Sequence, residues 1–587
     1  MIEKVLENLI KKALESLGIE GAETLNVSLE HPEVMAHGDY STNVAMVLAK
    51  KMGENPRELA GKIKEEMDSV LQRNDRGENM IEKIEVAGPG FINFYLAKKV
   101  FENGVGEILK DGNQYGRNNI LDGQRTIIDY TDPNPFKDFH IGHLMSNAIG
   151  ESLSRIMEAN GAIVKRANYQ GDVGIHVAKA IWGAFKMLNE SECKKAFFGG
   201  WFGLGKNSKI WGQAYTLGAI AFETDENAKK EITNLNKKIY DRSDGKINKL
   251  YDIGRKTSLE YFEKIYKILG TKFDYYFFES EVDDLGKAIV LEAMAKGYFE
   301  KSDGAVIFRG EKYDPLLHTR VFISSQGLPT YEAKEIGLTK EKYRRFAFDK
   351  TIAVTGNEIN DYYRVVKKAM EFTIPDLASK VVHIGHGMLR LPSGKMSSRT
   401  GQVITGESLL TEIQKNILEK MRDRMMSKKE KTQIAEIVAV GALKYSILKQ
   451  AAGGDIIFDF DKSISFEGDS GPYLQYSYVR AKSVLEKAKD ENVKAKINKG
   501  DSDGSVLEKM LLRFTEVVER AGREYSPHYL AIYLTELASA FSTFYAEGKI
   551  VDKTDAKSPY KIALTQAFSV VMKSGLNLLG IKVPEKM

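Results

Sequence analysis

Two histidines, His140 and His143, stand three residues apart in the segment KDFHIGHLMSN, in a chain that has only nine histidines. Residues at this spacing share one face of a helix, so a helix that begins here directs both imidazoles the same way. Gly142, between them, leaves the backbone open to a flat ligand, and the free N–H groups of a helix N-terminus favour phosphate oxygens. The segment is therefore a candidate nucleotide site. Taken alone, an H-x-x-H pair is more often explained by two partly buried capping histidines.

A second candidate lies downstream, in the segment LPSGKMSSRTGQ. Two glycines bracket a lysine, two serines and an arginine, an arrangement that offers cations and hydroxyl groups to a polyphosphate. By itself this segment could also be a solvent-exposed turn. The residues concerned are Gly394, Lys395, Ser397, Ser398, Arg399 and Gly401. Another H-I-G-H, His383 to His386, follows an apolar run and leads into a glycine-containing segment, so we interpret it as a strand and a loop.

The elements around His140 and His143 follow the order strand, turn, helix, strand. RTIIDYTDPNP predicts an apolar strand that ends in a turn, the histidines open a helix, and AIVKRANYQGD predicts a second strand with a loop. This order is the βαβ pattern of a parallel sheet. It places the histidines at the carboxyl edge of the sheet, where open α/β sheets bind ligands. The position therefore strengthens the case for a nucleotide site.

The chain of 587 residues is long enough for three or more domains. Residues 1–112 mix helical patterns with short apolar runs, and Gly88-Pro89-Gly90 separates two runs that alternate like half-buried strands. Residues 113–410 carry the parallel-sheet pattern, interrupted at about 182–314 by a less regular segment that we interpret as an insertion; sheet-like patterns resume at TRVFISSQGLPT. Residues 411–587 are mostly helical, which predicts a bundle. We therefore expect a multidomain α/β protein.

Composition excludes several classes of protein. Hydrophobic residues make up 43% and charged residues 28%, and no apolar stretch is long enough for a membrane span. The helix expected at the N-terminus contains the acids Glu3, Glu7 and Glu15, which a secretory or transit peptide would lack, so we expect a cytoplasmic protein. The single cysteine, Cys193, excludes an intrachain disulfide and a structural zinc held by paired cysteines. The net charge of +4 is too small to indicate a nucleic-acid partner by itself.

The two candidate segments together resemble the paired signatures of class I aminoacyl-tRNA synthetases. An H-I-G-H at a first strand-helix junction and a later K-M-S-S-R are weak signals apart and a strong signal in this order. The resemblance implies a Rossmann-type catalytic domain that binds ATP with Mg²⁺, in which His140, His143 and Lys395 are catalytic. The loop departs from the common K-M-S-K-S form, which leaves Lys395 as the main cation. The implied ATP-binding residues are His140, Gly142, His143, Lys395, Ser397 and Ser398.

The flanking segments resemble the arginyl-tRNA synthetase family in particular. DYTDPNPFKDFHIGHL, YQGDVGIH and PTYEAKEIGL match its catalytic segments, with Val173 in place of a tryptophan. HGDYSTNVAM and AGPGFIN are similar to its N-terminal domain, which grips the outer corner of tRNA. GDSGPYLQYSYVRAKSVL and LGIKVPEKM are similar to its helical anticodon-binding domain. The resemblance covers the whole chain.

An arginine pocket should contain acids, because a planar guanidinium is held best by carboxylates in bidentate geometry. The resemblance implies that Asp129 lies near the substrate's ammonium group and that Asn134 and His140 hold its other backbone groups. It implies that Tyr331 and Glu335 face the guanidinium, with Glu335 one methylene longer than the family's usual aspartate. In VTGNEINDYYRVV, Ile359 stands where the family has glutamine, so Asn357 or Asn360 are alternative contacts.

The helix expected around residue 475 combines aromatic and polar side chains that suit unstacked bases of an RNA loop. Judged without the resemblance, its tyrosines would more often pack between helices. With the resemblance, the expected tRNA-binding residues are Tyr473, Gln475, Tyr476 and Arg480, together with Asn43 in the N-terminal domain.

The resemblance implies an arginine–tRNA ligase that joins L-arginine to ATP and transfers the arginyl group to the 3′-terminal adenosine of tRNA-Arg. It also implies a monomer without a membrane partner, and no structural zinc. A cysteinyl enzyme shares the signatures but needs several cysteines for its zinc. A nucleotidyltransferase would not need the N-terminal and helical domains. A non-catalytic tRNA-binding paralogue stays open, because positions 173, 335 and 359 depart from the family.

Overall fold

The computed structural model describes residues 2–73, 80–189, 209–390 and 405–587. Its contacts divide the chain into two compact units. The first unit comprises Met1–Tyr115, Arg480–Phe514 and Glu536–Met572, and the second comprises Gly116–Val479, Thr515–Thr535 and Lys573–Met587.

The first unit contains an α+β domain built on a small antiparallel sheet. Its strands lie in the order β1 (Tyr40–Thr42), β3 (Phe91–Leu96), β2 (Ile81–Ala87). The turn Gly88-Pro89-Gly90 joins β2 to β3, as predicted, with both glycines at positive φ. The amphipathic helix predicted at the N-terminus is α1, which buries Leu6, Leu9, Ile10, Ala13 and Leu14. The other helices of this domain are α2 (Val44–Met52), α3 (Pro56–Arg73) and α4 (Lys98–Asp111), and α1 spans Ile2–Ser16.

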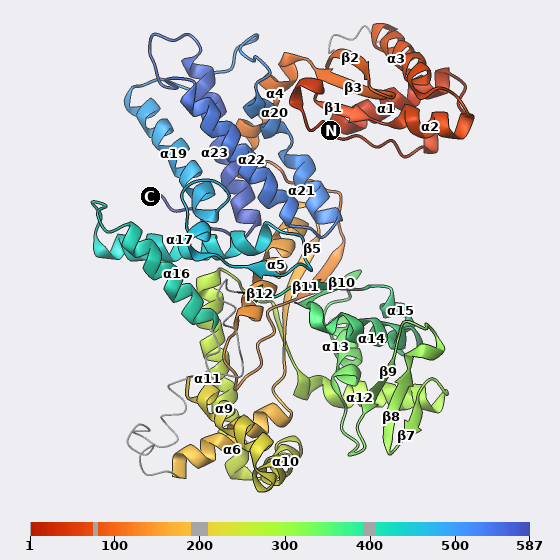
Figure 1. Ribbon diagram of the computed structural model, residues 1–587, viewed down its shortest axis with the longest axis vertical. Helices are drawn as coiled ribbons and strands as arrows, with labels where there is room; N and C mark the ends of the chain where they lie inside the picture. The colour runs from red at the N-terminus through yellow and green to blue at the C-terminus, as the bar shows by residue number, and fades with distance from the viewer. Residues whose placement is uncertain (1, 74–79, 190–208, 391–404) are drawn as a thin grey trace. The chain divides into compact units, whose positions relative to one another are not determined.

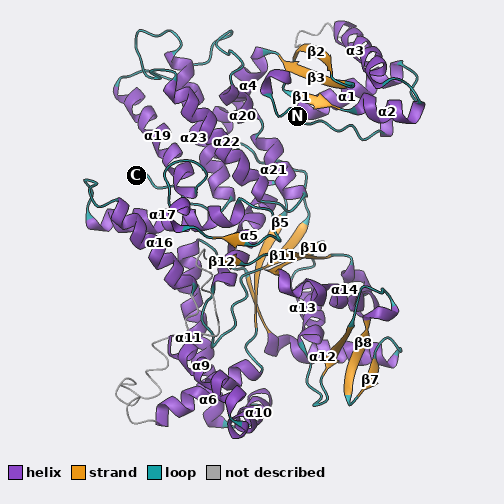
Figure 2. Ribbon diagram, in the orientation of Figure 1, coloured by secondary structure: helices purple, strands orange, loops and turns teal. Residues whose placement is uncertain are grey.

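The second unit is organised by a five-stranded parallel sheet, shown with its helices in Figures 1 and 2. The strand order is β11 (Val381–His386), β10 (Lys350–Gly356), β4 (Arg125–Asp129), β5 (Ile163–Gln170), β6 (Tyr275–Phe278). Every neighbouring pair is parallel. Helix α5 (Ile141–Ala159) connects β4 to β5 and packs on the sheet, which confirms the predicted βαβ order. The second H-I-G-H is the end of β11, as interpreted from sequence.

Two strands depart from the sequence-based expectation. β6 joins the parallel sheet as an edge strand although it lies inside the segment predicted as an insertion. With four residues, YYFF, it is too short to show a strand period. β9 (Thr319–Ile323), in the segment TRVFISSQGLPT, pairs antiparallel with β8 (Ala305–Arg309) and not with the parallel sheet. β8 also pairs with β7 (Glu300–Ser302), so these three strands form a separate sheet.

The remaining helices occupy the connections and the C-terminal region. Those between β5 and β11 are α6 (Ile175–Asn189), α9 (Lys209–Thr224), α10 (Glu226–Asp241), α11 (Gly245–Leu269), α12 (Glu279–Ala295), α13 (Tyr331–Arg345), α14 (Asn360–Thr373) and α15 (Pro375–Ala378). Those beyond residue 405 are α16 (Gly406–Lys420), α17 (Lys428–Leu448), α18 (Phe460–Ser463), α19 (Gly471–Asp490), α20 (Val506–Leu512), α21 (Phe514–Arg523), α22 (His528–Ala546) and α23 (Ser558–Leu578). The predicted helical character of the C-terminal region is confirmed. Only the short strand β13 (Ile456–Ile457) interrupts it among the described residues, and it pairs with β12 (Leu389–Arg390).

The core of the second unit explains why α5 is held firmly. Ile127, Ile128 and Ala167 of the central strands are fully buried. Nearly every residue of α5 is buried as well, including polar side chains that contact neighbouring elements. Over the described ranges, none of the helices is both long and apolar enough to cross a bilayer.

Candidate active site

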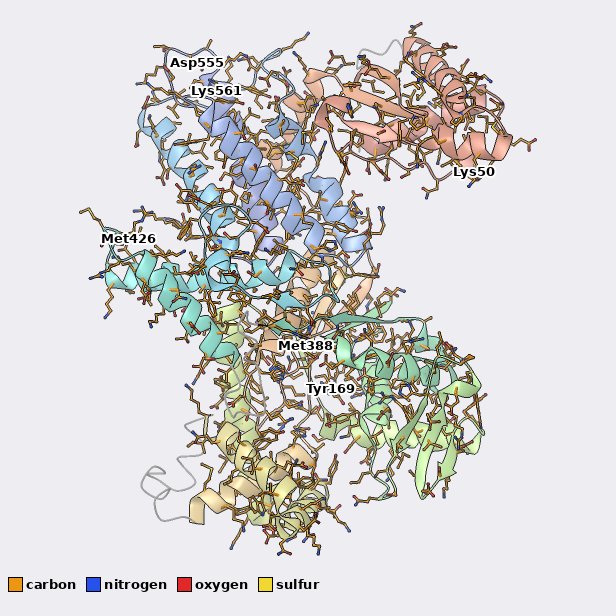
Figure 3. The ribbon with its side chains drawn as sticks, viewed as in Figure 1. Lys50, Tyr169, Met388, Met426, Asp555 and Lys561 are labelled. Carbon is orange, nitrogen blue, oxygen red and sulfur yellow. The ribbon has the colours of Figure 1, made fainter. Side chains whose placement is uncertain are left out.

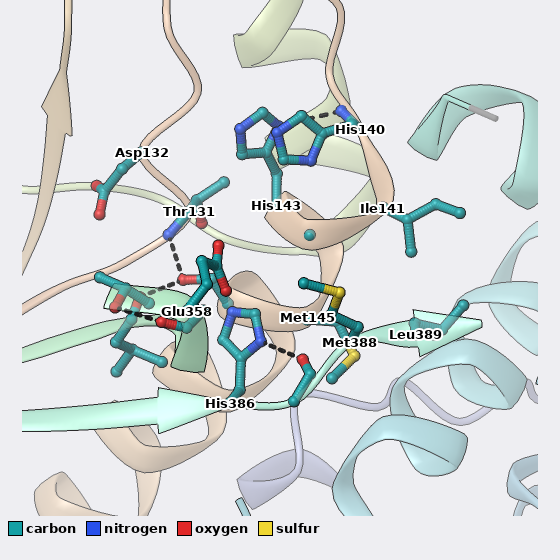
Figure 4. A pocket seen from close by; sticks show the side chains of 16 residues that line it. Thr131, Asp132, His140, Ile141, His143, Met145, Glu358, His386, Met388 and Leu389 are labelled. Carbon is teal, nitrogen blue, oxygen red and sulfur yellow. Dashed lines mark hydrogen bonds between the residues drawn. The ribbon is translucent and has the colours of Figure 1, made fainter. Parts of the chain in front are cut away.

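A cavity of about 330 Å³ opens at the N-terminus of α5, next to the carboxyl ends of β4, β10 and β11 (Figure 4). This is the edge of the sheet at which the sequence predicted a ligand site. The cavity is lined by Thr131, Asp132, His140, Ile141, Gly142, His143, Met145, Ser146, Val354, Thr355, Gly356, Glu358, His386, Gly387, Met388 and Leu389.

The two histidines of the first H-I-G-H both cap α5 and line this cavity. Their rings stack with centroids 3.6 Å apart and an interplanar angle of 22°. The backbone N–H of His140 donates to Nδ1 of His143 at 3.1 Å, so the neutral His143 ring carries its proton on Nε2. The two interpretations of these histidines, as helix caps and as part of a nucleotide site, are therefore compatible, because the same two side chains cap α5 and line the cavity.

The surroundings of both histidines favour their uncharged form. Desolvation by the surrounding protein lowers the pKa of His140 to about 4, although the residue keeps solvent access at the mouth of the cavity. Burial lowers the pKa of His143 well below its usual value, and the neighbouring His140 and Lys137 add to this effect. The rings can therefore bind phosphate oxygens as neutral hydrogen-bond donors but supply no full positive charge.

Gly142 is required by the stacked histidines. A Cβ at this position would lie 3.0 Å from Cε1 and 3.1 Å from Nδ1 of His140. These separations are shorter than ordinary van der Waals contacts, so a side chain would displace the ring. The glycine acts here through the space it leaves and not through an unusual backbone angle.

The turn between β4 and α5 holds a strained backbone. Thr131, Asp132 and Phe136 have φ values of +79°, +45° and +69°, a region that residues with a side chain seldom adopt. Two residues of α5 stabilise it: the Thr131 N–H donates to Ser146 Oγ at 2.9 Å, and Asn147 Nδ2 donates to Thr131 Oγ1 at 3.0 Å. Strain of this kind concentrates at functional sites. Sequence reasoning missed Ser146 and Asn147, because no motif marks them.

His386, from the second H-I-G-H, also reaches the cavity. Its Nδ1 lies 2.7 Å from the carbonyl oxygen of Gly387, which can only accept, so Nδ1 carries the proton and Nε2 is an acceptor. Sequence analysis assigned this histidine no role. The signal that could have found it is its position at the carboxyl end of a parallel strand.

At the same sheet edge lie two acids predicted to bind arginine, Asp129 and Glu335, and a third acid, Asp132, lines the cavity itself. Asp129 accepts a hydrogen bond from Lys342 Nζ at 2.7 Å, and both are buried. Asp132 accepts from the backbone N–H of Tyr169 at 2.8 Å (Tyr169 is labelled in Figure 3). Glu335 is buried and accepts from Tyr363 Oη at 3.1 Å. Of these partners, sequence reasoning identified none.

The carboxylates of this region outnumber its cations. Glu279 pairs with Lys334 at 2.7 Å, as Asp129 does with Lys342, while Asp132 and Glu335 have no lysine or arginine partner among the described residues. Desolvation raises the pKa of Glu335 to about 7, and desolvation with the nearby Asp129 raises that of Asp132 well above its usual value. Lys137 also acts on Glu279, so when all four acids ionise, four carboxylates face three lysines and one negative charge is uncompensated. The region therefore favours a cationic ligand.

The other predicted residues of this group are placed as follows. Asn134 Oδ1 accepts from the Gly171 N–H at 2.8 Å, which ties the β4–α5 turn to the end of β5. Tyr331 begins α13, is 59% exposed, and lies one turn before Glu335 on the same helix. Lys395, Ser397, Ser398 and Arg399 lie outside the described residues.

The predicted tRNA-binding residues stay a prediction. In the second unit, Gln475 is fully buried and its Nε2 donates to the carbonyl oxygen of Lys582 at 2.6 Å, which favours the helix-packing explanation at that position. Tyr473 and Tyr476 are half-buried on the same helix. In the first unit, the guanidinium of Arg480 lies over the ring of Tyr545, 5.1 Å from its centroid, and Asn43 precedes α2.

Three family profiles match consecutive parts of the chain. "Arginyl tRNA synthetase N terminal domain" matches residues 4–96, "tRNA synthetases class I (R), catalytic domain" matches residues 104–460, and "DALR anticodon binding domain" matches residues 474–587. These matches follow the order of the predicted modules, while the exact domain boundaries predicted above stay a prediction.

Curated relatives and solved structures agree with the profiles. The chain is 30% identical to proteins named "Arginine--tRNA ligase" from Clostridium botulinum, over 99% of each chain, and from Clostridium beijerinckii, over 100% of this chain and 99% of the relative. It shares its fold with arginyl-tRNA synthetases of Thermus thermophilus (TM-score 0.78, 22% identity, 100% of both chains) and Plasmodium falciparum (TM-score 0.76, 20% identity, 100% of this chain and 99% of the other). The chain belongs to the arginyl-tRNA synthetase family of class I aminoacyl-tRNA synthetases.

Proposed function

We propose that this chain is an arginine–tRNA ligase, which activates L-arginine with ATP and transfers the arginyl group to the 3′-terminal adenosine of tRNA-Arg. The observation that carries the proposal is the juxtaposition of two chemically different sites at one sheet edge. A neutral histidine pair at a helix N-terminus suits phosphate oxygens, and the adjoining excess of carboxylates suits an amino acid with a cationic side chain.

In the first step, the carboxylate of arginine attacks the α-phosphorus of ATP, the bond to the β-phosphate oxygen breaks, and pyrophosphate leaves. His143 Nε2–H and the N–H groups of α5 would donate hydrogen bonds to the phosphate oxygens as charge shifts onto the leaving group. Lys395 would supply the positive charge that the neutral histidines lack. Mg²⁺ would accompany ATP as part of the substrate complex.

The adenine of ATP would lie toward His386. The neutral ring of His386 has an acceptor at Nε2, because its Nδ1 proton is engaged by Gly387. An exocyclic amine of a purine is a donor of the required kind. Met388 and Leu389, which line the same cavity, offer apolar surface to the ring.

Arginine would occupy the acidic region. Asp129 would approach its ammonium group while keeping Lys342, and Asn134 and His140 would hold its remaining backbone groups. Tyr331 and Glu335, one turn apart on α13, would face the guanidinium. Catalysis then depends on holding the carboxylate next to the α-phosphorus, which is chiefly positioning combined with charge stabilisation.

In the second step, the terminal ribose of tRNA-Arg attacks the arginyl carbonyl and AMP leaves. Membership of class I supports the 2′-hydroxyl as the nucleophile. The predicted tRNA contacts are Tyr473, Gln475, Tyr476, Arg480 and Asn43. We further propose that the protein acts as a monomer in the cytoplasm, without a membrane partner and without a structural zinc.

The test is aminoacylation of total tRNA with each labelled amino acid separately. We expect incorporation of arginine alone, and we expect it to require ATP and Mg²⁺. Because the family resemblance implies that adenylate formation depends on bound tRNA, the assay must contain tRNA. Incorporation of lysine or cysteine would contradict the proposal. Absence of any incorporation by folded protein would favour the non-catalytic paralogue.

A further inference from the structure

Within the proposed arginine site, Glu335 departs from the family pattern, which has the shorter aspartate at this position. Its Oε1 accepts the hydrogen bond from Tyr363, and its Oε2 accepts none from any residue that the structure describes. Lys342, whose charge also acts on Glu335, is directed to Asp129 at 2.7 Å. Tyr363 therefore holds one carboxylate oxygen of Glu335, and the other oxygen is available to a ligand. Glu335 forms no ion pair with any residue that the structure describes.

Tyr363 is itself held rigidly. The residue is buried, with 6% of its surface exposed. Its ring stacks on His383 of β11 with centroids 3.9 Å apart and an interplanar angle of 5°. His383 Nε2 in turn lies 2.7 Å from Thr355 Oγ1 of β10. Two strands of the parallel sheet thus fix the ring of Tyr363, which fixes the direction of its hydroxyl toward α13.

One departure from the family pattern, Glu335, accepts this hydrogen bond, and another, Ile359, directly precedes the helix that carries Tyr363. Ile359 carries no polar group where the family has glutamine, and Tyr363 lies four residues later, in the first turn of α14. Asn357 and Asn360, the alternatives suggested by sequence, are engaged elsewhere. Asn357 Nδ2 donates to the Gly453 carbonyl at 3.3 Å, and Asn360 lies against Gly385.

We infer that Tyr363 is a positioning residue for arginine specificity: its hydroxyl fixes the carboxylate of Glu335 so that the free oxygen meets the guanidinium. The longer acid and the tyrosine together replace the shorter acid and the glutamine of the family pattern. This inference rests on the proposed function and adds to it a residue that the family resemblance does not assign.

The charge environment supports this role. Burial raises the pKa of Glu335 to about 7, while the hydrogen bond from Tyr363 acts in the opposite direction and favours the ionised form. Removing the hydroxyl should therefore make Glu335 harder to ionise and weaken arginine binding most at low pH. The ionisable groups that face Glu335 are Lys342 and Asp129, with Tyr363, Glu279, Asp132, Tyr169 and Tyr362.

The experiment compares Tyr363→Phe with a matched control, Tyr343→Phe. Tyr343 is on α13 itself, packs edge-to-face on Phe348, and its hydroxyl makes no hydrogen bond within the described part of the chain. For Tyr363→Phe we expect the KM for arginine to rise about tenfold or more, as for a lost hydrogen bond to a charged group. The KM for ATP should stay unchanged, and the pH at which the arginine KM levels off should move upward. Tyr343→Phe should change none of these quantities.

A double-mutant cycle with Glu335→Asp separates a direct link from general damage. The shorter aspartate should lose the hydroxyl of Tyr363, so adding Tyr363→Phe to it should raise the arginine KM by less than about twofold. Additive effects, or an unshifted pH profile in Tyr363→Phe, would overturn the inference. These outcomes leave the proposed function standing, because wild-type charging of arginine is measured in the same assay. Thermal unfolding of each variant shows that it is folded.

Discussion

The proposed ATP end and the proposed arginine end of the site lie at one sheet edge, but burial has opposite consequences for their proposed roles. Desolvation favours the uncharged form of any ionisable group, and it acts on the histidines of the first end as on the acids of the second. In the role proposed for His140 and His143, as hydrogen-bond donors to phosphate, the neutral form that burial favours is the one required. In the role proposed for Glu335 and Asp132, as partners of a cation, the charged form is required, and desolvation raises the pKa of both groups and so opposes it.

This contrast separates two requirements of the reaction. In the proposed phosphate end, the histidine pair is arranged at the N-terminus of α5, where the His140 N–H donates to His143 Nδ1. The arginine end must accept charge, and its acids come from β4, the following turn, α12 and α13. The first is therefore local in sequence and the second is assembled by the fold.

Lys342→Met should be the most damaging change at the arginine end. It leaves Asp129 buried without its cation, in a region that already has an excess of carboxylates. Removing one partner of a buried ion pair costs about 3–5 kcal/mol, and we expect a loss of this size in the free energy of unfolding measured in urea. Lys340→Met, on the exposed side of the same helix, is the control. A loss below about 1 kcal/mol would show that Lys342 does not neutralise Asp129.

His143→Ala should be the most damaging change to chemistry at the ATP end. It removes the Nε2–H donor and the acceptor that holds the His140 N–H, so both the phosphate contact and the cap are lost. Loss of one donor to developing charge typically costs a factor of about 100 or more, and we expect this decrease in the single-turnover rate of adenylate formation with tRNA present. His318→Ala, an exposed histidine of the same unit, should leave the rate unchanged. An unaltered rate in His143→Ala would remove this residue from the mechanism.

The histidine end of the site was predictable from sequence because its residues lie close together in the chain. His140, Gly142 and His143 lie together in the chain, follow a recognisable strand and open a helix, so spacing alone indicated their common face. The β2–β3 hairpin was predictable likewise, because Gly88-Pro89-Gly90 determines it within a few residues.

The assembled end was not predictable from sequence. Lys342 and Tyr363 contact the acids only after α13 and α14 pack beside the sheet, and no short motif distinguishes them from other buried residues. The edge strand β6 was missed because its pairing with β5 is long-range. The strand β9 was predicted, but its pairing with β8 in a separate antiparallel sheet was not. The family resemblance supplied Asp129 and Glu335 but not the partners that set their charge.

The two ends should also respond differently to pH. Because the pKa of Glu335 is raised to about 7, its protonated form predominates below that value, and in its proposed role Glu335 must lose this proton to bind arginine. The KM for arginine should therefore fall about fivefold as the pH rises from 6 to 7, and level off by about pH 8. The KM for ATP should stay nearly constant over the same range, since the pKa of His140 is lowered to about 4. Parallel pH profiles for the two substrates would contradict the distinction.

Gly142→Ala should have the smallest effect and tests the shape of the ATP end. The added methyl would press on the ring of His140, which must tilt from its stack with His143, a distortion that costs about 0.5–1.5 kcal/mol. We expect a few-fold slower adenylate formation. Alanine is also a better helix former than glycine, so the free energy of unfolding should not fall and could rise slightly. Gly61→Ala, in a helix with open space around the new methyl, should show the rise in stability without the slower reaction. A loss of rate accompanied by no loss of stability would show that Gly142 serves the geometry of the histidines and not the folding of α5.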